Sequence, residues 1–493
     1  MGNIIKVSGG KMRETSLKDY TAYAERIKTN AAQYVKESSS DGILFGEPQT
    51  PPVKEADFDI RITLLKDKDT LLPLGITSFK GQEENKSLKF KITITGEGVN
   101  QWQLEIKRKD QIIYKLYSAT NELQDVEIQG TASKNKNNTP AQSPVPPTEK
   151  PKRFWPAGEY LVAWDGFNSD GIYDSFALTK GKKFIATIKG QANFRSKEAN
   201  TDPFSFKYDG VEWVDMKIDK TTKIIEVTLR VNLQDGGAKG IDPVKMGGTV
   251  DPDFEYNPWD RIPPKKIEEW KKTPIKSRIR SFDQLKQMTL AGLKQYWSRS
   301  QSNKTDAKLA KDVMISKEPY QVNLTAVHTE NNALNPIDLV FNTNDDWDRS
   351  GNPGILAKLS YNAGYIKYSN GWGYQEPTAE DAEFSFTAAH EIGHPILKAF
   401  GNYAYSWQHK GSSYLLNQDP KPTPDAGTLE KVWKDNTHID HMPSTSGEYY
   451  PVSGEVDLMK YYHNEPNPKT FSRSIAAERD VLGLLWLTKL KIE

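Results

Sequence analysis

The sequence predicts a multidomain chain in which β-sandwich modules are followed by an α+β domain. Three observations support this prediction. The chain has 493 residues, a length that fits about three domains. Its first half contains short runs in which apolar and polar residues alternate, as they do in half-buried strands. Later parts contain apolar residues spaced by three or four, as in amphipathic helices.

The composition excludes several kinds of site. The chain contains no cysteine, which excludes disulfides, thiolate metal sites and a cysteine nucleophile. Its net charge is +1, so no overall field attracts nucleic acid, and we expect no nucleic-acid partner. No apolar run is long enough for a transmembrane helix, and the N-terminus lacks the apolar core of a secretory signal peptide. Any export is therefore expected to use a route that needs no signal peptide.

Turn-forming residues divide the β-rich part of the sequence into segments. Residues 1–52 are polar and rich in glycine and proline, and we interpret them as an N-terminal docking segment or a partly ordered tail. Residues 53–130 and 154–240 are expected to form β-rich modules. Residues 131–153 are expected to form a low-complexity linker or loop. The pattern does not decide whether 53–240 is one module or two.

Two features of the second β-rich segment concern its turns. A hairpin is predicted around residues 219–222. The W-D-G sequence at 164–166 resembles the Ig-like modules of bacterial surface and secretion proteins, which implies an Ig-like sandwich. The carboxylates of Asp165, Asp170 and Asp174 lack the spacing of a calcium-binding EF-hand loop, so we expect them to stabilise turns.

The C-terminal domain is expected to span residues 264–493, after a glycine- and proline-rich linker at 241–263. Helical spacing predicts helices within residues 264–300. A closing helix is predicted over residues 470–490, with Ser472 as its N-cap.

One short segment of this domain carries the residues for metal chemistry. His390, Glu391 and His394 form the pattern H-E-x-x-H, which is typical of zinc peptidases. On a helix the two histidines share one face, where neutral imidazoles can hold Zn²⁺ while Glu391 takes a proton from water. Pro395 follows and would remove the helix hydrogen bond to the carbonyl of Glu391, so we expect a kink or a proline tolerated by the metal-bound turn. The alternative is an ordinary amphipathic helix with two buried histidines.

A catalytic zinc site needs a third protein ligand and one open position. Six of the seven histidines lie between residues 390 and 463. His409 is the first candidate, because a helix end at Gly401 lets the chain turn back over the metal. Glu455 is the alternative third ligand. His438 and His441 are weaker candidates, since they could serve a separate site or a solvated loop.

The sequence D-L-M-K-Y-Y at residues 457–462 resembles the methionine turn of metzincin peptidases. The resemblance implies that Met459 lies beneath the metal and that Tyr461 stabilises the developing oxyanion, which makes Tyr461 a candidate catalytic residue. The spacing departs from the metzincin pattern, because His409 follows His394 by a longer interval. The alternative is that Met459 and Tyr461 belong to the core and its rim.

Three segments together, H-E-I-G-H, W-Q-H-K-G-S and S-G-E-V-D-L-M-K-Y-Y, resemble the metallopeptidase toxin domains of type VI secretion spike proteins and related contractile injection systems. The resemblance implies a zincin-like metallopeptidase domain that uses Zn²⁺ to hydrolyse a protein or peptide substrate. It also implies a secreted antibacterial effector, made in the cytoplasm and delivered to a target cell. The expected partners are a secretion spike protein and an immunity protein.

Two alternative functions are open at the level of the sequence. The same chemistry could act on the peptide stems of the cell wall. The protein could also be a structural or delivery component in which the metal site is vestigial.

Overall fold

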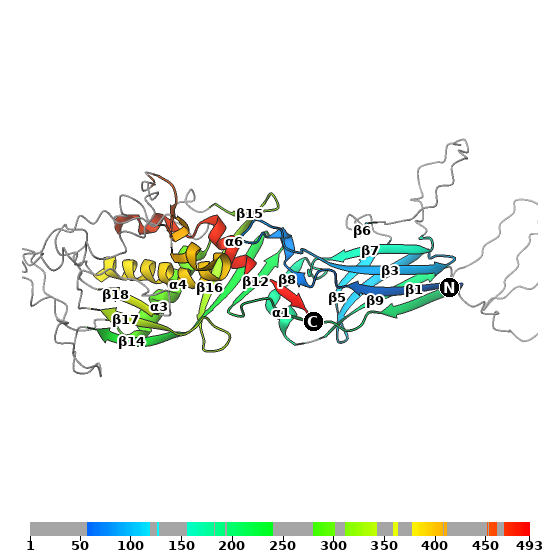
Figure 1. Cartoon of the computed structure of the whole chain (residues 1–493), viewed down its shortest axis with the longest axis horizontal. Coiled ribbons are helices and arrows are strands. Elements are labelled where there is room, and N and C mark those ends of the chain that lie inside the picture. Colours follow the sequence, from blue (N-terminus) through cyan, green and yellow to red (C-terminus); the bar gives the residue numbers. More distant parts are fainter. Residues whose placement is uncertain are drawn as a thin grey trace, which may run out of the picture. The chain divides into compact units, whose positions relative to one another are not determined.

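The structure is a computed structural model, and its β-rich character agrees with the prediction: most elements are strands and few are helices (Figure 1). The expected docking segment at 1–52 and the expected linkers at 131–153 and 241–263 lie outside the described residues. The structure describes residues 57–118, 126–127, 155–181, 183–192, 195–239, 280–300, 311–342, 358–362, 377–407, 409–411, 451, 453–460 and 468–493.

Two four-stranded antiparallel sheets pack against each other in the N-terminal half, with strand orders β1-β3-β7-β6 and β10-β9-β4-β5. Alternate side chains of β3 are buried, which is the pattern that predicted these strands. Gly190 of β9 allows the sheets to approach closely, since a Cβ there would lie 3.0 Å from Ile60 of β1. The strands are β1 (Phe58–Leu65), β3 (Leu88–Gly96), β4 (Gln101–Arg108), β5 (Gln111–Tyr117), β6 (Val126–Glu127), β7 (Gly158–Trp164), β9 (Phe184–Ala192) and β10 (Arg195–Asn200).

The strand pairing crosses the expected boundary between the two β-rich segments. Strand β3 pairs with β7, and β4 pairs with β9. Both sheets therefore combine strands from 53–130 and from 154–240, and the two segments form one two-sheet unit. The alternating pattern shows which face of a strand is buried, but it does not identify the partner strand.

The end of the second β-rich segment belongs to sheets of the C-terminal half. The predicted hairpin is present between β12 and β13, where Asp219 accepts hydrogen bonds from the backbone of Thr221 and Thr222. Strand β13 then pairs in parallel with β16, in a sheet of order β15-β16-β13-β12-β8. A boundary at 241–263 therefore separates strands that share a sheet. These strands are β8 (Ile172–Asp174), β12 (Val214–Asp219), β13 (Ile224–Val231), β15 (Val313–Ile315) and β16 (Glu318–His328).

Two further sheets join distant segments. The first is parallel and has the order β14-β17-β18, with β14 (Leu233–Lys239), β17 (Ile337–Asn342) and β18 (Lys358–Asn362). The second has the order β11-β21-β2, with β11 (Phe206–Tyr208), β21 (Leu490–Ile492) and β2 (Thr70–Leu71). The last strand of the chain thus pairs with strands from both β-rich segments.

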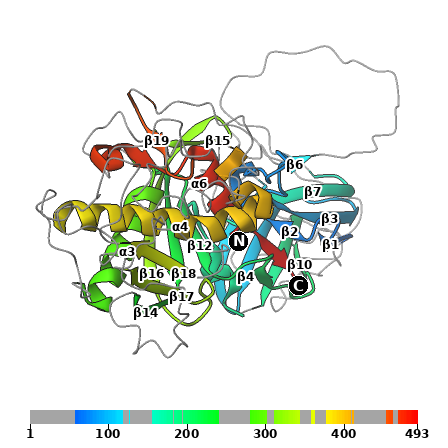
Figure 2. The same cartoon turned by 60° about the vertical axis from the view of Figure 1, so that its left-hand side comes forward.

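The helix α3 (Phe282–Trp297) lies within the range predicted to be helical, and it packs against α4 (Pro377–Trp407) (Figure 2). A capping box between Ser281 and Gln284 fixes the start of α3. Gly292 allows the two helices to approach, because a Cβ there would overlap the carbonyl of Ser385. Trp297 donates from Nε1 to the carbonyl of Ala389 at 3.1 Å, so α3 holds the middle of α4 in place.

The closing helix is shorter than predicted. The helix α6 (Glu478–Trp486) begins after Ala477, whereas Ser472 lies in the 3-10 turn η7 (Pro468–Arg473). Glu478 and Asp480 occupy its first turn, where the positive end of the helix dipole favours acidic side chains. Asp480 is fully buried, which places a charged group inside the C-terminal half.

A loop of the N-terminal half reaches the helices of the C-terminal half. It follows the 3-10 turn η1 (Pro73–Gly75). The ring of Phe79 meets those of Phe400 and Tyr405 edge to face, with centroids 5.5 and 4.8 Å apart. Trp486 of α6 donates from Nε1 to Glu84 at 2.9 Å. The two halves are therefore tied together beside α4.

Two of the three carboxylates that were expected to stabilise turns, those of Asp165 and Asp174, do stabilise local structure. Asp165 accepts a hydrogen bond from the backbone of Phe167 at 3.3 Å. Asp174 caps the short helix α1 (Ser175–Thr179) by accepting a hydrogen bond from Ala177 at 2.8 Å. Asp165 also makes an ion pair with Lys220.

In the described part of the chain, no helix combines the length and the apolar character needed to cross a membrane.

Candidate metal centre

The H-E-x-x-H pattern lies on α4, which continues through Pro395 with helical backbone angles. The helical geometry breaks instead at Asn402, with φ 76° and ψ 177°, directly after the helix end expected at Gly401. Asn402 then accepts a hydrogen bond from the backbone of Tyr405 at 3.2 Å, which starts one more helical turn. The break turns the chain back toward the histidines.

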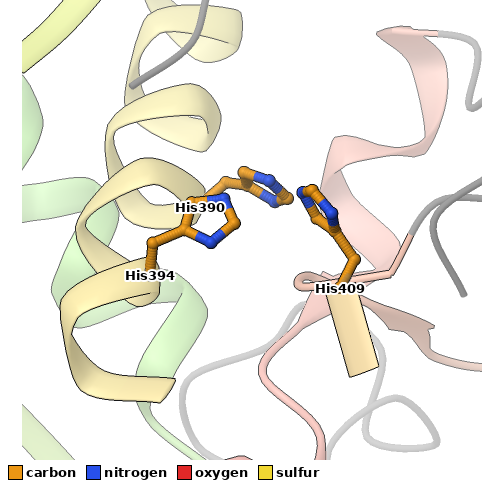
Figure 3. A group of neighbouring side chains, drawn as sticks. All are labelled: His390, His394 and His409. Carbon is orange, nitrogen blue, oxygen red and sulfur yellow. The ribbon is translucent and has the colours of Figure 1, made fainter. Parts of the chain in front are cut away.

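Three histidines converge at this point (Figure 3). His390 and His394 come from α4, and His409 comes from the 3-10 turn η6 (His409–Gly411). One nitrogen from each ring lies within 4.8 Å of the others. All three residues are buried, with exposed fractions of 5, 5 and 8%. The group contains the pair from the sequence pattern and the first candidate for a third ligand, and among the described residues it is the one cluster of this kind.

The ring of His390 is oriented by a backbone carbonyl. Its Nδ1 lies 2.6 Å from the carbonyl oxygen of Leu458. A carbonyl can only accept, so Nδ1 carries the proton and donates it. In the neutral ring the lone pair is then on Nε2, which is the arrangement that metal-binding histidines use.

Ser406 fixes the tautomer of His394 in a similar way. The Ser406 hydroxyl donates its only proton to the carbonyl of His394 at 2.9 Å. The same oxygen lies 3.1 Å from Nδ1 of His394, and it must therefore accept the proton of Nδ1. The lone pair of His394 is again left on Nε2.

The surroundings keep His394 neutral. Burial and, less strongly, the nearby His390 lower the pKa of His394 to about 3. A metal ligand must be the neutral imidazole, so the site is ready for a cation without first losing a proton. Three neutral imidazoles without a thiolate suit a transition metal such as zinc, copper, nickel or iron.

Glu391 lies beside the histidines. Its Oε2 is 3.7 Å from Nε2 of His394, and its side chain is 7% exposed. A carboxylate here can exchange a proton with a molecule held beside the imidazoles. The structure thus brings together the four residues His390, Glu391, His394 and His409.

Glu455, the alternative third ligand, does not belong to this group. Its carboxylate accepts from Nη2 of Arg299 at 3.0 and 3.2 Å. Arg299 is 1% exposed and also donates to the carbonyl of Ala476 at 2.9 Å. A buried guanidinium needs a counter-charge, which explains why Glu455 pairs with Arg299 and does not join the histidines.

Met459 packs against α4 at Gly393, between the positions of His390 and His394. It is fully buried, and a Cβ on Gly393 would overlap its thioether. The turn is fixed by Asp457, whose Oδ1 accepts from the backbone of Met459 at 3.0 Å. Leu458, between them, supplies the carbonyl that orients His390. The other candidates, Tyr461, His438 and His441, lie outside the described residues.

Sequence analysis missed three groups that support the centre: Ser406, the carbonyl of Leu458 and Lys410. The Lys410 ammonium makes ion pairs with Asp457 and with Asp480. Burial alone lowers the pKa of Lys410, but the two carboxylates outweigh burial and raise its pKa above the ordinary value. No local pattern marks these groups, because most of their partners are distant in the sequence.

Comparison with known protein families, curated proteins and solved structures gives no match to this chain. The chemistry of the centre is therefore inferred from its own residues.

Proposed function

We propose that this protein is a zinc-dependent metallopeptidase of the zincin type. The observation that carries the proposal is the convergence of His390, His394 and His409 beside Glu391. Two of the imidazoles are oriented through Nδ1, which leaves Nε2 for the metal. Three histidines with one open position are the donor set of a catalytic zinc site.

Each residue of the centre has a role in peptide hydrolysis. The three imidazoles hold the metal, and zinc, when bound, acidifies water and polarises a carbonyl group. Glu391 accepts the proton of the attacking water and passes it to the leaving amine. We assign Tyr461 to the developing oxyanion, on the resemblance of its segment to the metzincin methionine turn.

The biological setting is proposed from the sequence segments alone. Their similarity to effectors of contractile injection systems supports a secreted antibacterial peptidase with a spike protein and an immunity protein as partners. Residues 1–52 are then the docking segment, and the two-sheet unit is an Ig-like module between this segment and the zincin-like part. The substrate is a protein or peptide.

The substitution Glu391→Gln tests the proposed chemistry. The amide keeps the shape of the side chain but cannot accept the proton, so the variant retains zinc and loses about 10²–10⁴-fold in hydrolysis. Glu383→Gln, a buried residue two turns earlier on α4, is the control and keeps both properties. Full activity of Glu391→Gln would refute the mechanism.

Digestion of different substrates distinguishes a peptidase that acts on proteins from one that acts on the cell wall. Purified protein is incubated with a panel of unfolded proteins and, in parallel, with purified sacculi. Cleavage of the sacculi alone would assign the peptidase to cell-wall peptide stems. Zinc content below about half an equivalent, with no gain after zinc is added, would favour a structural or delivery role.

A further inference from the structure

Lys410 directly follows the third histidine of the centre, and its turn has an unusual backbone. The φ angles are 46° at His409 and 63° at Lys410. Residues other than glycine seldom adopt this left-handed conformation. The turn that presents His409 therefore needs contacts from elsewhere to hold it.

The Lys410 side chain supplies such contacts. Its ammonium makes an ion pair with Asp457, and a second one with Oδ2 of Asp480 at 2.8 Å. The Lys410 side chain is 8% exposed and that of Asp480 is 0% exposed. Asp480 is held in turn by the hydroxyl of Tyr405, which donates to Oδ1 at 3.2 Å. Lys410 thus joins the turn of His409 to α6.

The ion pair with Asp457 leads back to the first histidine. Asp457 also accepts from the backbone of Met459 at 3.0 Å, which fixes the turn between them. That turn presents the carbonyl of Leu458 to Nδ1 of His390 at 2.6 Å. One ammonium therefore connects the backbone that carries His409 with the carbonyl that orients His390.

The burial of these charges gives the connection its strength. Ion pairs on the surface contribute little, because water screens them. In this cluster the charges are largely removed from water, and the loss of the ammonium would remove the positive charge that joins the two neighbouring carboxylates. The turn of His409 would then be released from both anchors.

We propose that Lys410 is a positioning residue of the metal centre, which fixes His409 beside His390 and His394 through its ion pairs with Asp457 and Asp480. This inference rests on the proposed function, since it requires that the three histidines hold a metal. Lys410 is not itself a ligand and acts through His409. Outer groups that orient metal ligands typically change metal affinity about 10- to 100-fold when they are removed.

A double-mutant cycle on zinc affinity tests the proposal. Lys410→Met is made in the unaltered chain and in His409→Ala, and zinc affinity is measured by competition with a chelator. We expect binding about 10- to 100-fold weaker when His409 is present, and a change of no more than about twofold when His409 is absent. Lys398→Met removes an exposed lysine of α4 and leaves the affinity unchanged in both backgrounds.

A second variant covers the case in which Lys410→Met does not fold. Asp480→Asn takes its place in the same cycle, because the amide keeps the shape but loses the ion pair with Lys410. If either variant weakened zinc binding equally with and without His409, its role would be generally structural and the inference would be overturned. An unchanged zinc affinity in the presence of His409 would overturn it as well. Failure of the unaltered chain to bind zinc would overturn the proposed function as well, so the two failures are distinguishable.

Discussion

Ser406 contacts His394 at both the backbone and the ring. Its hydroxyl donates to the His394 carbonyl at 2.9 Å and lies 3.1 Å from Nδ1 of the same residue. Because the hydroxyl has one proton, these two contacts determine which ring nitrogen is protonated. The last helical turn of α4 thus sets which ring nitrogen of a histidine twelve residues earlier keeps its lone pair.

This relationship predicts the effect of Ser406→Ala. The variant loses the acceptor for Nδ1, so the ring of His394 is no longer held, and zinc binding should weaken about 10- to 100-fold. Chelator competition measures the change. Ser385→Ala is the matched control, because the Ser385 hydroxyl donates to a helix carbonyl, that of Asp381, at 2.9 Å. Equal zinc affinities in the two variants would contradict the assigned tautomer.

The contact between α3 and α4 predicts whether a further substitution raises or lowers the free energy of unfolding. In a helix, glycine to alanine is ordinarily stabilising, by about 0.5–1 kcal/mol. At Gly292 the added methyl group would overlap the backbone of Ser385, so Gly292→Ala should instead lower the free energy of unfolding by about 1–3 kcal/mol.

Urea unfolding of the unaltered protein and of the Gly292→Ala variant measures this difference in the free energy of unfolding. Gly158→Ala is the control, because the nearest atom to its added Cβ is 3.8 Å away, in Tyr160. A Gly292→Ala variant as stable as the unaltered protein would show that the two helices do not lie this close.

The buried Asp480 predicts a dependence of stability on pH. Burial and, less strongly, the nearby Asp457 raise the pKa of Asp480 from 3.8 to about 6, although Lys410 acts in the opposite direction. Between these pH values the folded chain holds a proton that the unfolded chain has released. The contribution of Asp480 to the free energy of unfolding is therefore present at low pH and lost as the pH rises from about 4 to about 6.

The comparison with Asp480→Asn isolates this effect, because the amide does not titrate. Urea unfolding of the metal-free proteins at several pH values should show the unaltered chain losing stability relative to the variant across the window from about 4 to about 6. A constant difference, or a gain over that window, would contradict the raised pKa.

The candidate site could be predicted in large part from local patterns. His390, Glu391 and His394 are close in the sequence, and a helix places them together. His409 could be chosen because Gly401 ends the helix nearby. The hairpin of β12 and β13 was predictable for the same reason, since its strands are neighbours along the chain.

The remaining features depend on partners that are distant in the sequence. Asp457 and Asp480 lie 47 and 70 residues beyond Lys410, so the burial of this lysine leaves no local signal. The parallel pairing of β13 with β16 joins segments on either side of an expected linker, and an alternating pattern does not specify that partner. The effect of Pro395 on the helix could not be predicted either. The local rule allowed a kink or a tolerated proline and did not choose between them.

The most direct test of the metal centre is the identity of the groups around a bound zinc ion. Crystals of the zinc-loaded protein, with diffraction recorded at the zinc absorption edge, would locate the ion from its anomalous signal. We predict one ion bound by Nε2 of His390, His394 and His409 at about 2.0–2.1 Å, with Glu391 beside it and Glu455 still paired with Arg299. An ion bound by Glu455 in place of His409, or no ion among the three histidines, would contradict this prediction.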